Sequence, residues 1–177
     1  MNTIDNNLPH RKNQRLKEFD YTTTGYYFVT ICIERMGTYL GEIFNSKVKL
    51  NRNGEIVDEC WKDLPSHYPN CELDEYIIMP DHFHGIITIE NGYTSKVNKN
   101  EIVKKLHGLS EIIRGFKTFS SRRINERLKE HGNFRWQKSF YDRIIRNERE
   151  LYNIRKYIEQ NPLKWEIEKG NTENLEL

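Results

Sequence analysis

Residues 72–90, ELDEYIIMPDHFHGIITIE, define the fold more clearly than any other stretch of the chain. They contain two apolar segments with a tight Pro-Asp turn between them, which predicts two antiparallel strands, 72–79 and 84–90. His82 and His84 stand two residues apart where the second strand begins. Because successive strand residues point to opposite faces of a sheet, both imidazoles are expected on one face. The phenylalanine between them is expected in the opposite layer.

The segments on either side of this hairpin complete an alternation of strands and helices. β-Branched and aromatic runs predict strands, and apolar residues at helical spacing predict helices. Before the hairpin, the expected elements are strands 26–34, 38–43 and 47–50 and a helix 55–64 that Pro65 stops. After it come a polar loop 91–100 and a helical stretch 102–129, in which Gly108 and Gly115 allow a break. The chain then continues with an extended piece 135–145 and a helix 148–160 ended by Pro162. This is the order of a ferredoxin-like α+β sandwich, with helices packed on one face of an antiparallel sheet.

The composition is that of a single globular domain. Of 177 residues, 36% are hydrophobic and 31% are charged, which is enough to bury a core. We expect one domain at 21–165, a loose polar arm at 1–20 and a polar tail at 166–177. The longest apolar run, 26–33, is too short to cross a bilayer, and the N-terminus lacks the apolar segment of a signal peptide. The three cysteines never form a CxxC pair, so neither a disulfide framework nor a thiolate zinc site is expected, and the cytoplasm is the expected compartment.

Positive charge is concentrated in one part of the chain, although the net charge is only +2. Residues 104–129 hold eight Lys and Arg against two Glu. An imbalance of this kind is most often a solvated helix face, but it also allows a basic surface for nucleic acid. The candidate DNA contacts in this stretch are Lys117, Arg122 and Arg123.

The His-x-His pattern fits three kinds of site. A histidine-triad nucleotide hydrolase has a third histidine two residues further on, where this chain has Ile86. A zinc site needs further Cys or His ligands, and the other histidines show no ligand-like spacing. In the third kind, the HUH nuclease, two histidines on a central strand work with a nucleophilic tyrosine on a nearby helix. Taken alone, the pair is equally typical of two partly exposed histidines at a strand end.

A tyrosine that meets this requirement lies near the C-terminus. In YNIRKYIEQNP, residues 152–162, Tyr157 and Asn161 are four apart, and therefore one helical turn apart on the same face. Gln160, three residues on, is an alternative polar partner. The competing interpretation is an amphipathic-helix tyrosine beside an asparagine that Pro162 forces out of the helix. The HUH pattern in the same chain favours the catalytic interpretation.

The chain resembles the HUH single-tyrosine transposases over about residues 26–162. The pieces MPDHFHG, WQxSFYDxIIR and YIxxNP occur together in the family's order, and the last two favour the REP-associated branch over the small insertion sequences. The resemblance implies that His82, His84 and Asn161 are metal ligands and that Tyr157 is the nucleophile. It also implies a ferredoxin-like fold and single-stranded DNA beside a hairpin as the substrate. Members of the REP-associated branch can act as monomers, and a monomer is favoured here over a homodimer.

The chemistry of these residue types indicates the cofactor and the reaction. Two neutral imidazoles and an amide oxygen leave positions for phosphate and water, which suits Mg²⁺ or Mn²⁺. Attack by Tyr157 would leave a 5′-phosphotyrosine and a free 3′-OH, and rejoining needs no nucleotide cofactor, in keeping with the lack of a GxxxxGK[ST] loop. No side chain identifies itself as the general base. Arg143 and Arg146 are candidate phosphate ligands near the tyrosine helix, and Trp136 is either a base-stacking residue or a core aromatic.

Two alternatives belong to another functional class. A ferredoxin-like sheet with aromatics is also the plan of RNA-recognition domains, but their KGFGFVxF-type strand is missing here. A domesticated relative that binds hairpins without transposing would carry the same residues. The expected function is therefore a metal-dependent single-stranded DNA transposase, and the alternative is a non-catalytic module that binds hairpins or other nucleic acid.

Overall fold

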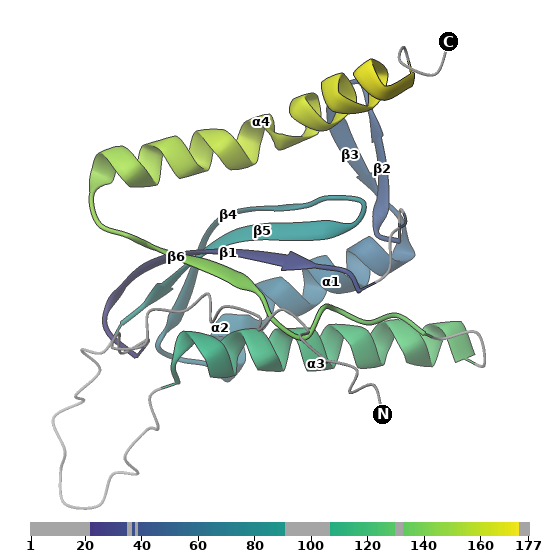
Figure 1. The fold of residues 1–177 in the computed structure, drawn as a ribbon. Coiled ribbons are helices and arrows are strands. Elements are labelled where there is room, and N and C mark those ends of the chain that lie inside the picture. The colour runs from purple at the N-terminus through teal and green to yellow at the C-terminus, as the bar shows by residue number, and fades with distance from the viewer. Residues whose placement is uncertain (1–21, 35–36, 38, 91–106, 130–132, 174–177) are drawn as a thin grey trace, which may run out of the picture.

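The computed structural model describes residues 22–34, 37, 39–90, 107–129 and 133–173 (Figure 1). The arm expected at 1–20, the loop expected at 91–100 and residues 174–177 of the expected tail lie outside these ranges. Within them, no helix has both the length and the apolar composition that a bilayer crossing requires.

The centre of the molecule is a four-stranded antiparallel sheet in the order β4-β5-β1-β6. Its strands are β1 Gly25–Cys32, β4 Cys71–Ile78, β5 His82–Ile89 and β6 Tyr141–Ile145. One helical segment lies between β1 and β4 and another between β5 and β6, and β6 pairs with the edge of β1 that does not face β5. This topology is the expected ferredoxin-like fold. The two inner strands, β1 and β5, place Thr30 opposite His84 and Cys32 opposite His82.

A separate hairpin lies outside this sheet. It is formed by β2 Gly41–Phe44 and β3 Lys47–Leu50, close to the two short strands that the sequence predicts. The turn residues Asn45 and Ser46 have φ values of 50° and 56°, the left-handed conformation of a tight hairpin turn. Figure 1 shows this hairpin beside the C-terminal end of the last helix, and the two are in contact.

Three helices pack below the sheet as drawn in Figure 1. They are α1 Arg52–Lys62, the short α2 Leu64–His67 and α3 Leu109–Leu128. α1 begins where the Asn51 side chain accepts the N–H groups of Asn53 and Gly54. α3 is one unbroken helix, and Gly115 has a packing role in it. A Cβ at Gly115 would lie 2.0 Å from the Tyr68 hydroxyl oxygen, so the glycine allows a close contact and does not break the helix.

The helix α4, Glu148–Glu173, covers the opposite face of the sheet (Figure 1). The expectation of helices on one face is therefore wrong for α4. Its apolar side packs on the sheet in a small cluster separate from the main core: Ile86, Ile145, Leu151, Ile154 and Ile158. The main core lies between the sheet and α1 with α3, where Trp61, Phe83 and Phe116 pack ring against ring.

Pro162 does not end α4, which contradicts the helix end expected before it. Residues 166–173, expected to be a polar tail, also belong to this helix. A proline inside a helix removes one hydrogen bond and crowds the preceding turn. Contacts made beyond it offset that cost: Glu166 accepts hydrogen bonds from the backbone and the hydroxyl of Ser46 at 2.8 and 2.7 Å. The Trp165 ring lies against the His82 ring.

Candidate active site

His82 and His84 lie side by side on the face of the sheet that α4 covers. Their ring centroids are 4.6 Å apart, and His84 is only 4% exposed. Phe83 points the other way, with its ring 4.4 Å from that of Trp61 in the main core. The strand alternation inferred from the sequence is confirmed by these positions. The core contacts of Phe83 hold this part of β5 in place and thereby set the direction of both imidazoles.

Each histidine uses its Nδ1 atom for a hydrogen bond within the protein. His82 Nδ1 lies 2.6 Å from Asp81 Oδ1, and His84 Nδ1 lies 2.8 Å from Thr30 Oγ1. With the proton of each ring on Nδ1, both Nε2 atoms carry lone pairs that are not used by Asp81 or Thr30. A carboxylate partner such as Asp81 is usual behind a metal-binding histidine, and the Thr30 hydroxyl takes the same position behind His84. The donor set therefore fits a metal bound through the two Nε2 atoms.

Burial keeps His84 in the form that binds metals. Removal from water, with a smaller effect from neighbouring His82, lowers the pKa of His84 from 6.5 to about 3, although the Asp81 carboxylate acts in the opposite direction. The imidazole is therefore neutral near pH 7. Cys32, opposite His82, does not add a thiolate, because burial and then the Asp81 charge raise its pKa. Among the described residues, no three His, Cys, Asp or Glu side chains group to hold a metal, so an oxygen from Asn or substrate would be needed.

Tyr157 reaches this histidine pair from α4. Its hydroxyl oxygen lies 3.4 Å from His84 Nε2, and the two rings are 5.2 Å apart. Asn161, one turn further along α4, is buried, with 7% of its surface exposed. Tyr157 itself is 38% exposed, and it borders an open hollow. The fold thus brings together residues that are 73 positions apart in the chain.

Several residues of the site were not found by sequence reasoning. Phe28 on β1 stacks on His84, with ring centroids 5.4 Å apart, and meets the Tyr157 ring edge-on. Lys164 and Trp165 contact Tyr157 and His82 from the part of α4 beyond Pro162. Of these, Lys164 and Trp165 could have been found as residues seven and eight positions after Tyr157 had the helix been extended through the proline. Phe28 has no comparable local signal.

Of the two predicted DNA contacts on or just after β6, Arg143 lies beside Tyr157. Arg143 on β6 is paired with Glu150, its Nε donating to that carboxylate at 2.8 Å. It borders an open hollow of about 360 Å³ beside Tyr157. The other residues around the hollow are Phe28, Glu150, Asn153 and Ile154. Arg146 lies just after β6, where its backbone N–H also donates to Glu150.

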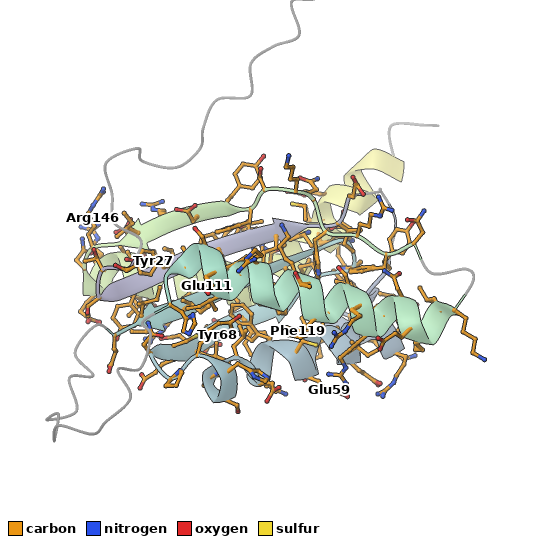
Figure 2. All side chains as sticks on the ribbon, turned by 90° about the horizontal axis from the view of Figure 1, so that it is seen from below. Tyr27, Glu59, Tyr68, Glu111, Phe119 and Arg146 are labelled. Atoms are coloured by element: carbon orange, nitrogen blue, oxygen red, sulfur yellow. The ribbon has the colours of Figure 1, made fainter. Side chains whose placement is uncertain are left out.

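The other three predicted basic contacts lie on α3, across the sheet from the histidines (Figure 1). Lys117 donates to the carbonyls of residues 137 and 138, Arg122 lies over the Phe119 ring, and Arg123 pairs with Glu59 on α1. Figure 2 looks onto this face, with Phe119 and Glu59 where α3 and α1 adjoin. The structure therefore does not bring these cations to the histidine site.

Trp136 lies in the main core and not on the surface. It is 6% exposed, packs against Phe116 and Phe134, and donates its indole N–H to the Ser120 hydroxyl at 2.9 Å. A ring enclosed in this way has no free face for a nucleobase. The expectation that Trp136 stacks on DNA is therefore corrected to the alternative, a core aromatic.

The similarity of this chain to known proteins agrees with the geometry of the histidine and tyrosine site. The family model described as "Transposase IS200 like" matches residues 36–161, which include both histidines, Tyr157 and Asn161. The chain belongs to the IS200-like transposase family. The resemblance drawn from the sequence motifs is thereby confirmed.

The relatives of this IS200-like chain align with most of its length. A Haemophilus influenzae protein of uncharacterised function is 35% identical over 169 residues, covering 90% of this chain and 92% of the relative. A second protein of that organism, assigned as a REP-associated tyrosine transposase, is 26% identical and covers 82% of this chain and 74% of its own length. A solved REP-associated tyrosine transposase bound to a REP hairpin has a TM-score of 0.58 at 19% identity, covering 85% of this chain and 74% of that one, which shows a shared fold.

Proposed function

We propose that this IS200-like transposase cuts and rejoins single-stranded DNA with Tyr157 as its nucleophile. The observation that carries the proposal is the 3.4 Å approach of the Tyr157 hydroxyl to His84 Nε2 in a chain of a transposase family. A phenol whose ordinary pKa is near 10 is a weak nucleophile unless it is oriented at its target. The packing of the Tyr157 ring against Phe28 and His84 supplies that orientation.

His82, His84 and Asn161 are the residues that would hold a divalent ion. Mg²⁺ or Mn²⁺ there would polarise a non-bridging oxygen of the scissile phosphate and orient it for in-line attack. Asp81 and Thr30 keep the two Nε2 atoms directed away from the sheet, toward α4. Asn161 presents its amide from the same face of α4 as Tyr157.

The reaction conserves the phosphodiester energy. Tyr157 Oη bonds to the phosphorus, the P–O3′ bond breaks, and the phenol proton passes through solvent to the departing 3′ oxygen. The products are a 5′-phosphotyrosine and a free 3′-OH. Attack by a different 3′-OH on the phosphotyrosine reverses these steps and joins two strands, with no other reactant.

The proposed substrate is a single strand next to a hairpin. The solved relative was bound to a REP hairpin, and the site here lies between α4 and the sheet. A flexible single strand can bend into such a site, whereas a stiff and wide duplex cannot place its backbone between α4 and the sheet. The hollow beside Tyr157 has Phe28 and Arg143 on its border, which suit an unstacked base and a phosphate respectively.

The decisive experiment compares three tyrosine variants on a labelled oligonucleotide with a hairpin and a single-stranded flank. Tyr157→Phe should fold, bind the oligonucleotide and form no covalent adduct and no free 3′-OH. Tyr152→Phe is a matched control on the same helix, because Tyr152 is 60% exposed and lies five residues before Tyr157, which puts it on a different side of the helix. Tyr141→Phe on β6 is the second control. A covalent adduct with Tyr157→Phe would refute the assignment, and no adduct with the wild type would favour the non-catalytic alternative.

A further inference from the structure

The part of α4 beyond Pro162 brings a cation to the nucleophile. The Lys164 ammonium nitrogen lies 4.9 Å from the centroid of the Tyr157 ring. Tyr157, Asn161 and Lys164 are spaced by four and three residues, so they follow one side of the helix. Lysine side chains on a helix lean toward its N-terminus, and here that direction is toward Tyr157. One stripe of α4 therefore carries the phenol, the amide and an ammonium group.

This position is held by contacts of the two residues that follow Lys164. Trp165 packs on His82, with ring centroids 5.8 Å apart. Glu166 accepts two hydrogen bonds from Ser46 in the turn of the β2–β3 hairpin, and these bonds lower the pKa of its carboxyl group. The backbone of this turn of α4 is thus tied to both the active site and the hairpin. Lys164 itself is exposed and can move its ammonium group around the Tyr157 ring.

The charge of Lys164 is not matched by a carboxylate within the described part of the chain. Its neighbours on α4 differ in this respect: Arg155 pairs with Asp74, and Lys156 pairs with Glu159. An ammonium group over the Tyr157 ring, with donors to spare, is well suited to an anionic oxygen. The anion that comes to this place in the proposed reaction is the scissile phosphate.

We propose that Lys164 contacts the phosphate that Tyr157 attacks and stabilises the negative charge that the transferring group carries. This inference rests on the proposed function. Lys164 keeps its proton throughout: the bonds that change are Oη–P and P–O3′, as above. Positive charge placed beside a developing anion stabilises the transition state electrostatically. The same contact would hold the 5′-phosphotyrosine until a 3′-OH attacks it.

The test measures single-turnover adduct formation with three lysine variants. Lys164→Gln removes the charge and keeps the length, and Lys164→Arg restores the charge. Lys156→Gln is the matched control, since Lys156 lies over the Tyr152 ring at 6.0 Å on the same helix, away from the histidines. We expect Lys164→Gln to slow adduct formation roughly 10- to 100-fold, the loss typical of one charge-assisted hydrogen bond. Lys164→Arg should recover most of the rate, and Lys156→Gln should stay within about twofold of the wild type.

A binding measurement separates a phosphate contact from a structural effect on α4. In the Tyr157→Phe background, Lys164→Gln should weaken binding of the normal oligonucleotide but not of one with an uncharged methylphosphonate at the scissile position. Equal adduct rates for Lys164→Gln and the wild type would overturn the role of Lys164 alone, and so would equal losses on both oligonucleotides. Absence of adduct in the wild type would overturn the proposed function itself.

Discussion

The residues behind the two histidines determine which ring nitrogens face α4. Asp81 and Thr30 each take one Nδ1 position, so they act on a bound ion only through the imidazoles. Their effect should therefore be visible in metal affinity without any DNA present. This separates the positioning of the histidines from the chemistry of Tyr157.

Removing either imidazole should abolish metal binding and leave the fold intact. His82→Ala and His84→Ala both lose one of two nitrogen ligands, and neither ring belongs to the main core. Mn²⁺ binding followed by electron paramagnetic resonance should disappear, and Mg²⁺- or Mn²⁺-dependent cleavage should disappear with it. Wild-type cleavage by both variants would show that the metal assignment is wrong.

Asp81→Asn should weaken Mn²⁺ binding by about 10- to 100-fold, because the amide no longer fixes the Nδ1 proton with a charge. Thr30→Val, which keeps the shape and removes the hydroxyl, should weaken it in the same direction. Asp63→Asn is the control: Asp63 makes a 2.8 Å contact to His67, an exposed pair outside the site. If all three variants bind Mn²⁺ as the wild type does, the two Nδ1 contacts do not position metal ligands.

At the scale of elements, α3 can pack closely against the loop after α2 because Gly115 has no side chain. Gly115→Ala in a helix normally stabilises by up to about 1 kcal/mol. Here the added Cβ would meet the Tyr68 hydroxyl oxygen, so we expect destabilisation by about 1–3 kcal/mol in urea unfolding. Tyr68→Phe in the same chain removes that oxygen and should recover much of the loss. A stabilised Gly115→Ala protein would contradict this packing.

The helix α4 is attached to the sheet edge by an ion pair that should respond to acid. Arg155 contacts both carboxylate oxygens of Asp74 on β4, and this hydrogen bonding lowers the Asp74 pKa below its ordinary value of 3.8. A lowered pKa means that the pair stabilises the fold above pH 3.8 and that this contribution is lost as the pH falls below it. Asp74→Asn should therefore lower the melting temperature by about 1–3 °C at pH 7, with the difference shrinking as the pH is lowered below 3.8. A difference that persists in acid would point to a cause other than charge.

At the scale of the whole molecule, the two halves of the site come from one chain. Tyr157 on α4 approaches His84 on β5 of the same molecule, so the site does not require a second copy. We therefore expect a monomer by light scattering at micromolar concentration. A mixture of His82→Ala and Tyr157→Phe proteins should form no adduct, because neither chain has a complete site. Adduct formation by the mixture would show that two chains share their active sites.

Local periodicity in the sequence by itself determined much of this protein. The alternation around Phe83 placed both histidines on one face, and the four-residue spacing put Asn161 beside Tyr157 on a helix. The order of strands and helices was enough for the ferredoxin-like class. These features depend on neighbours within a few residues, which is why a single sequence reveals them.

Only the tertiary structure decided which residues meet across those elements. The pairing of β1 with β5 supplies Thr30 to His84, and the packing of α4 on the sheet sets the distance between Tyr157 and His84. The continuation of α4 through Pro162 also depends on contacts with distant segments of the chain. Local preference predicts a helix end there, but Trp165 and Glu166 gain contacts with segments far away in the chain. Those contacts outweigh one lost backbone hydrogen bond, and they bring Lys164 to the nucleophile.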